Sequence, residues 1–420
     1  MKYSRPRGTQ DIVPPDIYVW RHVEGIFDDT FARFGYEPIR TPIFESTDLF
    51  LRSVGEDSDI GSKEMYTFED RGGRSITLRP ENTAAVIRAY LDAGMHRQGG
   101  VTRVSYIGPM FRYDRPQAGR FRQFHQVGVE AIGDMNPVID VEVIDVVMTG
   151  LEKLGFSGLT VKLNSVGCRV CRESYTALLI EALEANHDRL CEDCRARSKT
   201  NPLRVFDCKR DDEIKKELPA IADHLCDVCD SHFREVKVLL AGIDRNFEED
   251  PQLVRGLDYY TKTTFEILHG ELGAQNALCG GGRYDDLVEQ CGGPSTPAVG
   301  FSAGLERIIS VLPDRDQVGH GRTDFYVACL DEDSSERTLK TARTLRAYGD
   351  VEVDTSLRGL KKQLKAAEKK GARVVVIVEN DSRDELKWKD MDQRTQEDIK
   401  DDSLAARAQA FVRGVETDDG

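Results

Sequence analysis

The stretch 111–126, FRYDRPQAGRFRQFHQ, gathers side chains that could bind a polyanion. It contains four arginines, one histidine and three phenylalanines, although the 420-residue chain carries a net charge of −15. The planar guanidinium fork matches phosphate oxygens, and an aromatic ring stacks on a base with about 1–3 kcal/mol. The stretch therefore predicts a site for a planar, multiply anionic ligand such as a nucleotide.

The alternation of side chains along residues 121–130 indicates a strand with one face that could bind a ligand. Successive side chains of a strand point to opposite faces. One face would carry Arg122, Phe124, Gln126, Gly128 and Glu130, and the other Phe121, Gln123, His125, Val127 and Val129. The face with Phe124, Gln126, Gly128 and Glu130 offers an aromatic ring, an amide, space for a ligand at the glycine, and a carboxylate. A solvated sheet face would explain its polarity, but not the concentration of arginines beside it.

Three further segments combine glycine with charged or aromatic residues. LVRGLDYY (253–260) predicts a strand in which Arg255 either pairs with Asp258 or faces a bound anion. CGGGRYDDL (279–287) permits close approach of a ligand or forms a tight turn. In AVGFSAGLERI (298–308), Arg307 lies on the surface or points toward a ligand. The common phosphate-binding loops G-x-x-x-x-G-K-[ST] and G-x-G-x-x-G are absent from the sequence.

The sequence predicts two folded parts joined by a polar linker. Strand-like runs separated by Pro- and Gly-containing loops predict an α+β domain at 1–320, with helices flanking a mostly antiparallel sheet. A helical, Cys-rich subdomain at about 165–245 is expected to interrupt it. A βαβαβ order within 322–420 predicts a small α/β domain with a mainly parallel sheet.

Bulk composition narrows the class of protein. With 40% hydrophobic and 31% charged residues, the chain fits a globular protein. Its apolar runs are too short to span a bilayer, and MKYSRPRGTQDIVPP lacks the apolar core of a signal peptide. Ten cysteines without an export signal predict reduced thiols and a cytoplasmic location. The acidic balance argues against a general nucleic-acid coat protein, but local basic patches remain compatible with nucleic acid.

The motifs resemble those of a known enzyme family. FRYDRPQAGRFRQFHQVGVE resembles motif 2 of class II aminoacyl-tRNA synthetases, AVGFSAGLERI resembles motif 3, and the apolar stripe of helix 16–34 followed by Pro42 resembles motif 1, the dimer element. LVRGLDYYTKTTFE and CGGGRYDDL are similar to the two signature segments of the histidyl-tRNA synthetase family, and RPENTA (79–84) to its amino-acid loop. The likeness covers nearly the whole chain.

The resemblance implies a histidine–tRNA ligase that forms a homodimer through its N-terminal helix and strand. Such an enzyme activates L-histidine with ATP to histidyl-adenylate, releasing pyrophosphate, and then transfers histidine to the 3′ end of tRNA(His), releasing AMP. Arg112 and Arg255 would be the catalytic residues, holding the α-phosphate from two sides and contacting the histidine carboxylate region. Two anions react in the first step, so fixed positive charge, supplied by these arginines and Mg²⁺, matters more than a strong base.

The resemblance also implies which residues bind the substrates. The α-amino group of histidine would bind to Glu81, Thr83 and Gln126, and its imidazole to Glu130 and Tyr260. Tyr259 and Tyr284 would line the rest of the pocket. ATP would meet Arg112 at the α-phosphate, Arg120 at the γ-phosphate, and Phe124 and Arg307 on the two sides of the adenine.

The segment 322–420 resembles the anticodon-binding domain of the same family. Its expected helix at 358–370, RGLKKQLKAAEKK, carries Lys361, Lys362 and Lys365 on outward faces. A lysine cluster inside an acidic chain favours a phosphate contact with tRNA. A merely solvated lysine face is the alternative.

The cysteines allow two interpretations. CRVC (168–171), CEDC (191–194) and CDVC (226–229) have the spacing of zinc ligands, with Cys208 between them. The candidate ligands of a structural zinc are Cys168, Cys171, Cys191 and Cys194. Amino-acid activation needs no such metal, however, and CxxC pairs in helices can be ordinary buried thiols. Zinc is therefore not the favoured interpretation of the sequence.

Three other functions fit parts of the sequence. A regulatory paralogue of the family, assisting a histidine-biosynthetic enzyme, is disfavoured because the RGLDYY segment and the C-terminal domain are both present. A non-catalytic sensor of uncharged tRNA is expected to carry a large effector domain. A generic ATP-dependent ligase would not need the lysine-rich C-terminal part.

Overall fold

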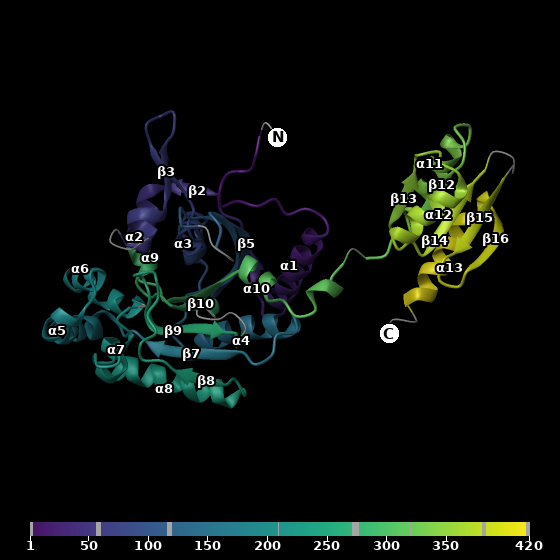
Figure 1. The fold of residues 1–420 in the computed structure, drawn as a ribbon. Helices are drawn as coiled ribbons and strands as arrows, with labels where there is room; N and C mark the ends of the chain where they lie inside the picture. Colours follow the sequence, from purple (N-terminus) through teal and green to yellow (C-terminus); the bar gives the residue numbers. More distant parts are fainter. Residues whose placement is uncertain are drawn as a thin grey trace. The chain divides into compact units, whose positions relative to one another are not determined.

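The computed structural model describes residues 3–55, 60–115, 120–208, 210–270, 277–319, 321–379 and 384–416. The chain divides into two compact units, 1–319 and 320–420, which are described separately (Figure 1). Among the described residues, no helix has both the length and the apolar character needed to cross a membrane.

An eight-stranded sheet forms the centre of the N-terminal unit. Its strand order is β1 (Glu37–Pro38), β5 (Thr102–Phe111), β6 (Gln123–Ile132), β11 (Ala298–Gly304), β10 (Ala277–Arg283), β9 (Thr261–Leu268), β7 (Thr160–Ser165) and β8 (Phe247–Glu249). The pairings from β5 to β7 are antiparallel, whereas the outer pairs β1–β5 and β7–β8 are parallel. The antiparallel centre brings strands far apart in sequence side by side.

Helices cover one face of this sheet and bury its apolar side chains. These helices are α1 (Asp16–Arg33), α4 (Pro137–Lys153), α8 (Asp227–Gly242) and α10 (Leu305–Ser310). Val127 and Val129 of β6 share one core with Phe27 of α1, Val143 of α4 and Phe233 of α8. The Asn136 side chain caps α4 by accepting a 3.0 Å hydrogen bond from the Val138 N–H.

The apolar stripe of α1 belongs to this core. Trp20, Val23, Phe27 and Phe31 are buried within the chain, and Phe34 packs partly against them. The helix ends at Arg33, and Gly35, two residues further on, takes a φ of +76°, which favours glycine. The stripe packs on the chain's own sheet, so it is not a free surface for a second subunit.

The opposite face of the sheet is bordered by smaller elements. A three-stranded antiparallel sheet has the order β2 (Phe44–Ser46), β4 (Ser75–Leu78) and β3 (Tyr66–Glu69). The nearby helical segments are α2 (Thr47–Val54), η1 (Ile60–Glu64), α3 (Thr83–Asp92), η2 (Met95–Arg97) and α9 (Leu287–Gln290), and η7 (Arg315–Gln317) closes the unit.

The chain between β7 and β8, here called the insertion, is helical. Its elements are α5 (Arg169–Ala185), η3 (His187–Arg189), α6 (Glu192–Thr200), η4 (Pro202–Asp207), α7 (Asp212–Lys215), η5 (Ile221–His224) and then α8. In Figure 1, α5, α6 and α7 gather at one end of the unit. Tyr175 and Leu179 of α5 share a core with Val86 and Ile87 of α3 and with Tyr284, so these helices pack against the body of the unit.

The C-terminal unit has a five-stranded sheet of order β13 (Val351–Asp354), β12 (Phe325–Cys329), β14 (Val374–Val378), β15 (Glu385–Asp390) and β16 (Thr395–Lys400). The pairs of β12 with β13 and β14 are parallel, as the βαβαβ pattern predicts. The last two pairings are antiparallel. The sheet is therefore mixed, and the sequence analysis missed β15 and β16.

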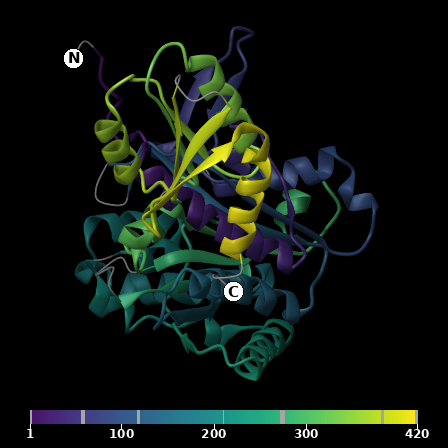
Figure 2. The same cartoon turned by 90° about the vertical axis from the view of Figure 1, so that its right-hand side faces the viewer.

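Helices enclose the C-terminal sheet. They are α11 (Ser335–Leu345), α12 (Leu360–Lys369), η8 (Asp401–Ser403) and α13 (Leu404–Glu416). Figure 2 shows α13, in yellow, beside the yellow strands, where Leu404 and Ala408 pack with Trp388 of β15. Ala367 of α12 packs with Tyr326 and Val375.

Candidate active site

A cavity of about 520 Å³ opens on the sheet face that the α1–α4 layer leaves uncovered. Arg112 and Arg255, which come from different segments, both line this one cavity. The other predicted residues that line it are Glu81, Thr83, Arg120, Phe124, Gln126, Tyr259, Tyr260 and Arg307. The motifs picked out in the sequence therefore meet at one place in the fold.

Arg112 follows directly after β5 and is held by two contacts. Its Nε donates a 2.8 Å hydrogen bond to the Pro80 carbonyl, and its guanidinium carbon lies 5.2 Å from the centre of the Phe124 ring. Burial lowers the pKa of Arg112, and Glu64 and Glu81 oppose that shift. The guanidinium group is thus fixed in orientation by contacts that leave it at the cavity wall.

Arg255 is paired with Glu266 of β9, whose carboxylate accepts from Nη1. Burial by itself lowers the pKa of Arg255, but Glu266 and Tyr260 outweigh it, so the pKa is raised. Within the described residues, the buried Nε of Arg255 has no hydrogen-bond partner. The partner suggested by the sequence, Asp258, instead forms a 2.7 Å ion pair with Arg204.

Gly280 lets Arg255 lie across β10. A β-carbon at Gly280 would collide with the guanidinium group. Gly300 on β11 does the same for Glu130, whose carboxylate occupies the space where a β-carbon would stand. The glycine-rich strand pattern therefore provides close approach between the backbone and charged side chains, not a tight turn.

The segment LVRGLDYY is not a strand. Residues 253–260 form a loop, and β9 begins at Thr261. Strand alternation would send Tyr259 and Tyr260 to opposite faces, whereas in the loop both line the cavity. Their ring centres are 4.8 Å apart.

Glu81 fixes the N-terminus of α3 at the cavity. Its carboxylate accepts hydrogen bonds from the backbone N–H groups of Thr83 (2.6 Å) and Ala84 (3.1 Å). Burial raises the pKa of Glu81, and these backbone hydrogen bonds oppose the shift. Glu81 thus lies just before the helix, next to the N-cap residue Asn82.

Glu130 does not itself line the cavity but contacts Thr83, which does. The Glu130 side chain is fully buried. Its carboxylate accepts from Thr83 Oγ1 at 2.8 Å, from the Tyr106 hydroxyl at 3.4 Å and from the Tyr284 hydroxyl. Burial raises the pKa of Glu130 to about 8, and the hydrogen bonds from Tyr284 and Thr83 oppose it. Tyr284 is likewise buried, with its ring centre 5.5 Å from that of Tyr259.

Gln126 and the predicted ATP residues occupy other parts of the cavity wall. Gln126 donates a long hydrogen bond of 3.4 Å to Ser302, and its buried Oε1 has no partner among the described residues. Arg307 donates to the Ala277 carbonyl at 2.6 Å. Arg120, partly exposed, pairs with Asp114 at 3.1 Å.

The insertion contributes residues to the cavity that the sequence motifs did not indicate. Arg197, Arg204 and Asp207 of the α6–η4 segment line the same cavity. Arg204 also donates to the Gly256 carbonyl at 2.9 Å, next to Arg255. Its position among apolar residues in NPLRVF was a usable indication, because a buried arginine requires partners.

Two predicted groups lie elsewhere. Lys361, Lys362 and Lys365 are exposed on α12 of the C-terminal unit. The four cysteines proposed as a zinc set do not form one group: Cys168 and Cys171 lie with Cys226 and Cys229, whereas Cys191 and Cys194 lie with Cys208 and Asp211. Sequence proximity misled here, because the chain returns to the first pair only at α8.

Comparison with known proteins agrees with this architecture. Residues 8–308 match the family model described as histidyl-tRNA synthetase, and residues 324–410 match that of an anticodon binding domain. A histidine–tRNA ligase of Thermotoga maritima is 49% identical over 381 residues, covering 90% of this chain and 91% of the relative. One from Natranaerobius thermophilus is 47% identical over 386 residues, with coverages of 90% and 91%.

The similarity extends to a solved structure. The apo histidyl-tRNA synthetase of S. aureus has a TM-score of 0.81 and 35% identity, and the match covers 97% of this chain and 100% of that one. The fold is that of a class II aminoacyl-tRNA synthetase. The chain belongs to the histidyl-tRNA synthetase family, whose activity is histidine–tRNA ligation. The resemblance found in the sequence is thereby confirmed.

Proposed function

We propose that histidine–tRNA ligation begins in the 520 Å³ cavity, with Arg112 and Arg255 as the catalytic residues. The observation that carries this assignment is their convergence: one follows β5 and the other precedes β9, yet both line one cavity with Glu81 and Thr83. Two cationic groups and a carboxylate in one cavity match the two kinds of charge on an amino acid and ATP.

In the proposed first step, a carboxylate oxygen of histidine attacks the α-phosphorus of ATP. The new O–P bond forms as the bond from the α-phosphorus to the β-phosphate oxygen breaks, and pyrophosphate leaves. Arg112 and Arg255 supply positive charge to the α-phosphate oxygens while negative charge accumulates there. Arg112 also orients the attacking carboxylate, since its Nε is already fixed to Pro80.

The amino-acid end is assigned to the acidic side of the cavity. Glu81, Thr83 and the unpartnered Oε1 of Gln126 would accept from the α-ammonium group. Glu130 and Tyr260 would bind the imidazole, with Tyr259 and Tyr284 packing beside it. Buried hydrogen-bonding groups of this kind reject apolar isosteres by roughly 10⁴-fold or more, because those ligands leave the protein groups unpaired.

The nucleotide end is assigned to the motif 2 and motif 3 side chains. Phe124 and Arg307 would hold the adenine between them, and Arg120 would meet the γ-phosphate. Mg²⁺ binds through one or two carboxylates together with substrate phosphates. Glu64, Asp114 and Glu306 are among the carboxylates that line the cavity and could offer an oxygen to this ion, which would offset phosphate charge when bound.

The second step passes histidine from the adenylate to the ribose hydroxyl at the 3′ end of tRNA(His), releasing AMP. We assign the catalytic domain to 1–320 and the anticodon-binding domain to 322–420, in line with the two compact units and the two family matches. Lys361, Lys362 and Lys365 are the proposed phosphate contacts, because all three are exposed on α12. We propose that the reaction takes place in the cytoplasm, where tRNA is charged for protein synthesis.

We propose that the chain forms a homodimer through the three-stranded sheet β2–β4–β3 and not through the apolar stripe of α1. Phe44 of β2 and Phe68 of β3 lie on the same face by strand register, with Ile76 and Leu78 between them. Phe44 is 54% exposed and Phe68 is 48% exposed. A contiguous apolar face of this kind marks an interface, and sedimentation equilibrium would test it by showing twice the 47.1 kDa chain mass.

The function is tested by amino-acid-dependent exchange of pyrophosphate into ATP. We expect histidine alone among the twenty amino acids to support exchange, because only its side chain pairs with both Glu130 and Tyr260. Exchange with another amino acid at a comparable rate would overturn the assignment of the pocket. No exchange with any amino acid in the presence of Mg²⁺ would overturn the proposed activation step.

Replacing the three lysines of α12 should separate tRNA binding from activation. We expect Lys361→Ser/Lys362→Ser/Lys365→Ser to raise the KM for tRNA by about tenfold and to flatten its salt dependence, since phosphate contacts release counterions. Histidine-dependent exchange should stay unchanged. Lys340→Ser on α11, an exposed lysine paired with Glu336, is the matched control. Equal losses in exchange and charging would contradict the assigned tRNA contact.

A further inference from the structure

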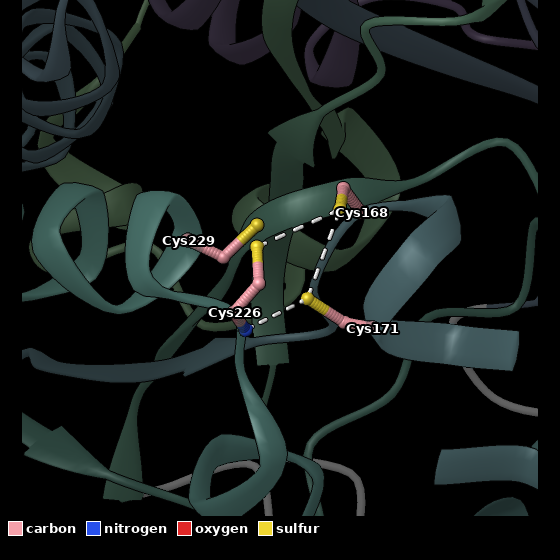
Figure 3. A group of neighbouring side chains, drawn as sticks. All are labelled: Cys168, Cys171, Cys226 and Cys229. Atoms are coloured by element: carbon pink, nitrogen blue, oxygen red, sulfur yellow. Dashed lines mark hydrogen bonds between the residues drawn. The ribbon is translucent and has the colours of Figure 1, made fainter. Parts of the chain in front are cut away.

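Two groups of thiols converge in the insertion, outside the cavity. The first contains Cys168, Cys171, Cys226 and Cys229, and the second contains Cys191, Cys194, Cys208 and Asp211. In each group the ligand atoms all lie within 4.8 Å of one another. Figure 3 shows the four sulfur atoms of the first group pointing toward one another.

The spacing of the first group matches a tetrahedron around one ion. The Sγ of Cys168 is 3.7 Å from that of Cys171 and 3.9 Å from that of Cys226. A Zn–S bond of about 2.3 Å requires sulfur atoms about 3.8 Å apart at the corners of a tetrahedron. The distances are nearly equal along the CxxC pair and across to the other helix, so no two sulfurs are singled out as a disulfide pair.

The chain builds this group from two helix starts. Cys168 is the N-cap residue of α5 and Cys226 that of α8, so partial positive charge faces the sulfurs. The Cys226 N–H donates to Cys171 Sγ at 3.1 Å. Gly167 takes a φ of +64°, and a β-carbon there would lie 2.5 Å from the Cys171 β-carbon, so glycine permits the approach. N–H donors and helix N-termini stabilise thiolates, the form that binds metal.

The second group has the same construction, with a carboxylate as its fourth donor. Cys191 is the N-cap residue of α6, and its Sγ lies 3.7 Å from that of Cys208. The Arg210 N–H donates to Cys208 Sγ at 3.3 Å. Asp211 is buried and accepts from the Cys191 N–H at 3.1 Å, which turns its carboxylate toward the thiols. Three thiols and one carboxylate are also a tetrahedral zinc donor set.

We propose that each group binds one structural Zn²⁺, one through four cysteines and the other through three cysteines and Asp211. Thiolate donors select zinc over hard cations such as Mg²⁺. Four protein ligands leave no open position for substrate or water, so these sites stabilise the fold and do not catalyse. The ten cysteines are all free, so the eight donors of the two groups remain available.

The second site lies close in the chain to the cavity. The segment between Cys194 and Cys208 carries Arg204, which contacts Gly256 and Asp258 in the loop of Arg255. The first site joins the start of α5, where Arg172 donates to the Asp258 carbonyl at 3.3 Å, to the start of α8. Zinc binding would therefore fix both sides of the insertion that contact this loop.

Metal content of the full-length protein tests the proposal. We expect protein purified without chelator to contain two zinc atoms per chain by mass spectrometry of metals. X-ray absorption at the zinc edge should show Zn–S distances of about 2.3 Å. Protein that contains no zinc and takes up neither Zn²⁺ nor Co²⁺ after reduction would overturn both sites.

Single amino-acid substitutions show which residues bind each of the two zinc ions. Cys226→Ser and Cys208→Ser should each lower the zinc content by one atom per chain, and Asp211→Asn should loosen only the second ion toward a chelator. Cys291→Ser, outside both groups, should retain two atoms. Where a variant is insoluble, Co²⁺ titration of the unaltered chain decides: absence of tetrahedral Co²⁺–thiolate absorption overturns the proposal. A content unchanged by Cys226→Ser overturns the first site, and one unchanged by Cys208→Ser overturns the second.

Discussion

Arg255→Ala is expected to slow histidine-dependent pyrophosphate exchange by about 10²–10³-fold, the scale for losing one preorganised donor to developing charge. The side chain lies at the cavity wall with its Nε unpartnered among the described residues. Removal takes a fixed cation from the α-phosphate and also leaves Glu266 without its ion-pair partner. The KM for ATP should change less than kcat, because the charge is needed most in the transition state.

The double variant Arg255→Ala/Glu266→Gln separates the two consequences. If Arg255 only neutralises Glu266, removing that carboxylate as well restores exchange. If Arg255 acts on the phosphate, the double variant stays as slow as Arg255→Ala, which is the expected result. Arg234→Ala, on an exposed arginine of α8, is the matched control and should exchange at the normal rate. Restoration in the double variant would refute the catalytic role.

Above pH 8, where the Glu130 carboxyl has lost its proton, Glu130→Gln is expected to lower kcat/KM for histidine by about 10²-fold, the scale of losing a hydrogen bond to a charged group. Glutamine keeps the shape of the side chain but cannot offer a charged acceptor to an imidazole N–H. The KM for ATP should stay near normal, because Glu130 contacts Thr83 and Tyr284 of the proposed amino-acid end and not the side chains proposed to bind the nucleotide. Glu248→Gln, on an exposed glutamate of β8, serves as the control.

The ionisation of Glu130 also predicts the direction in which the KM for histidine changes with pH. Burial raises the pKa of Glu130 to about 8, so the carboxyl keeps its proton at neutral pH and loses it as the pH rises through that value. A carboxylate accepts more strongly than a protonated carboxyl, so the KM for histidine should fall as pH rises through about 8. Ionisation of the substrate histidine affects the unaltered protein and the Glu130→Gln variant equally. The KM of the Glu130→Gln variant for histidine should therefore not fall in this pH range. Identical profiles would contradict the assignment.

The sequence was sufficient wherever the pattern is local. The period of two along β6 correctly groups Phe124, Gln126 and Glu130, because alternation follows from strand geometry alone. From the opposite row, Val127 and Val129 lie in the core, as that alternation requires. The same pattern was available for β15, where Leu386 and Trp388 are buried between lysines, so that strand could have been predicted.

Nonlocal contacts could not be predicted from the sequence. The Arg255 partner is Glu266 rather than the nearer Asp258, because Arg204 of the insertion binds Asp258. Residues 253–260 form a loop although their composition suggests a strand. The two cysteine groups likewise depend on the return of α8 to the start of α5. Charge pairing and metal-ligand grouping are decided by chain topology, which spacing alone does not reveal.

The positions of Gly280 and Gly300 limit which mutations of the gene the protein can tolerate. Every missense change of a glycine codon adds at least a β-carbon, and at these two positions that atom would stand where Arg255 or Glu130 lies. No amino-acid exchange there is conservative. On the far side of the same sheet, aliphatic residues such as Val127 and Val129 can be exchanged for others of similar volume at small cost. The two faces of one sheet should therefore drift at very different rates.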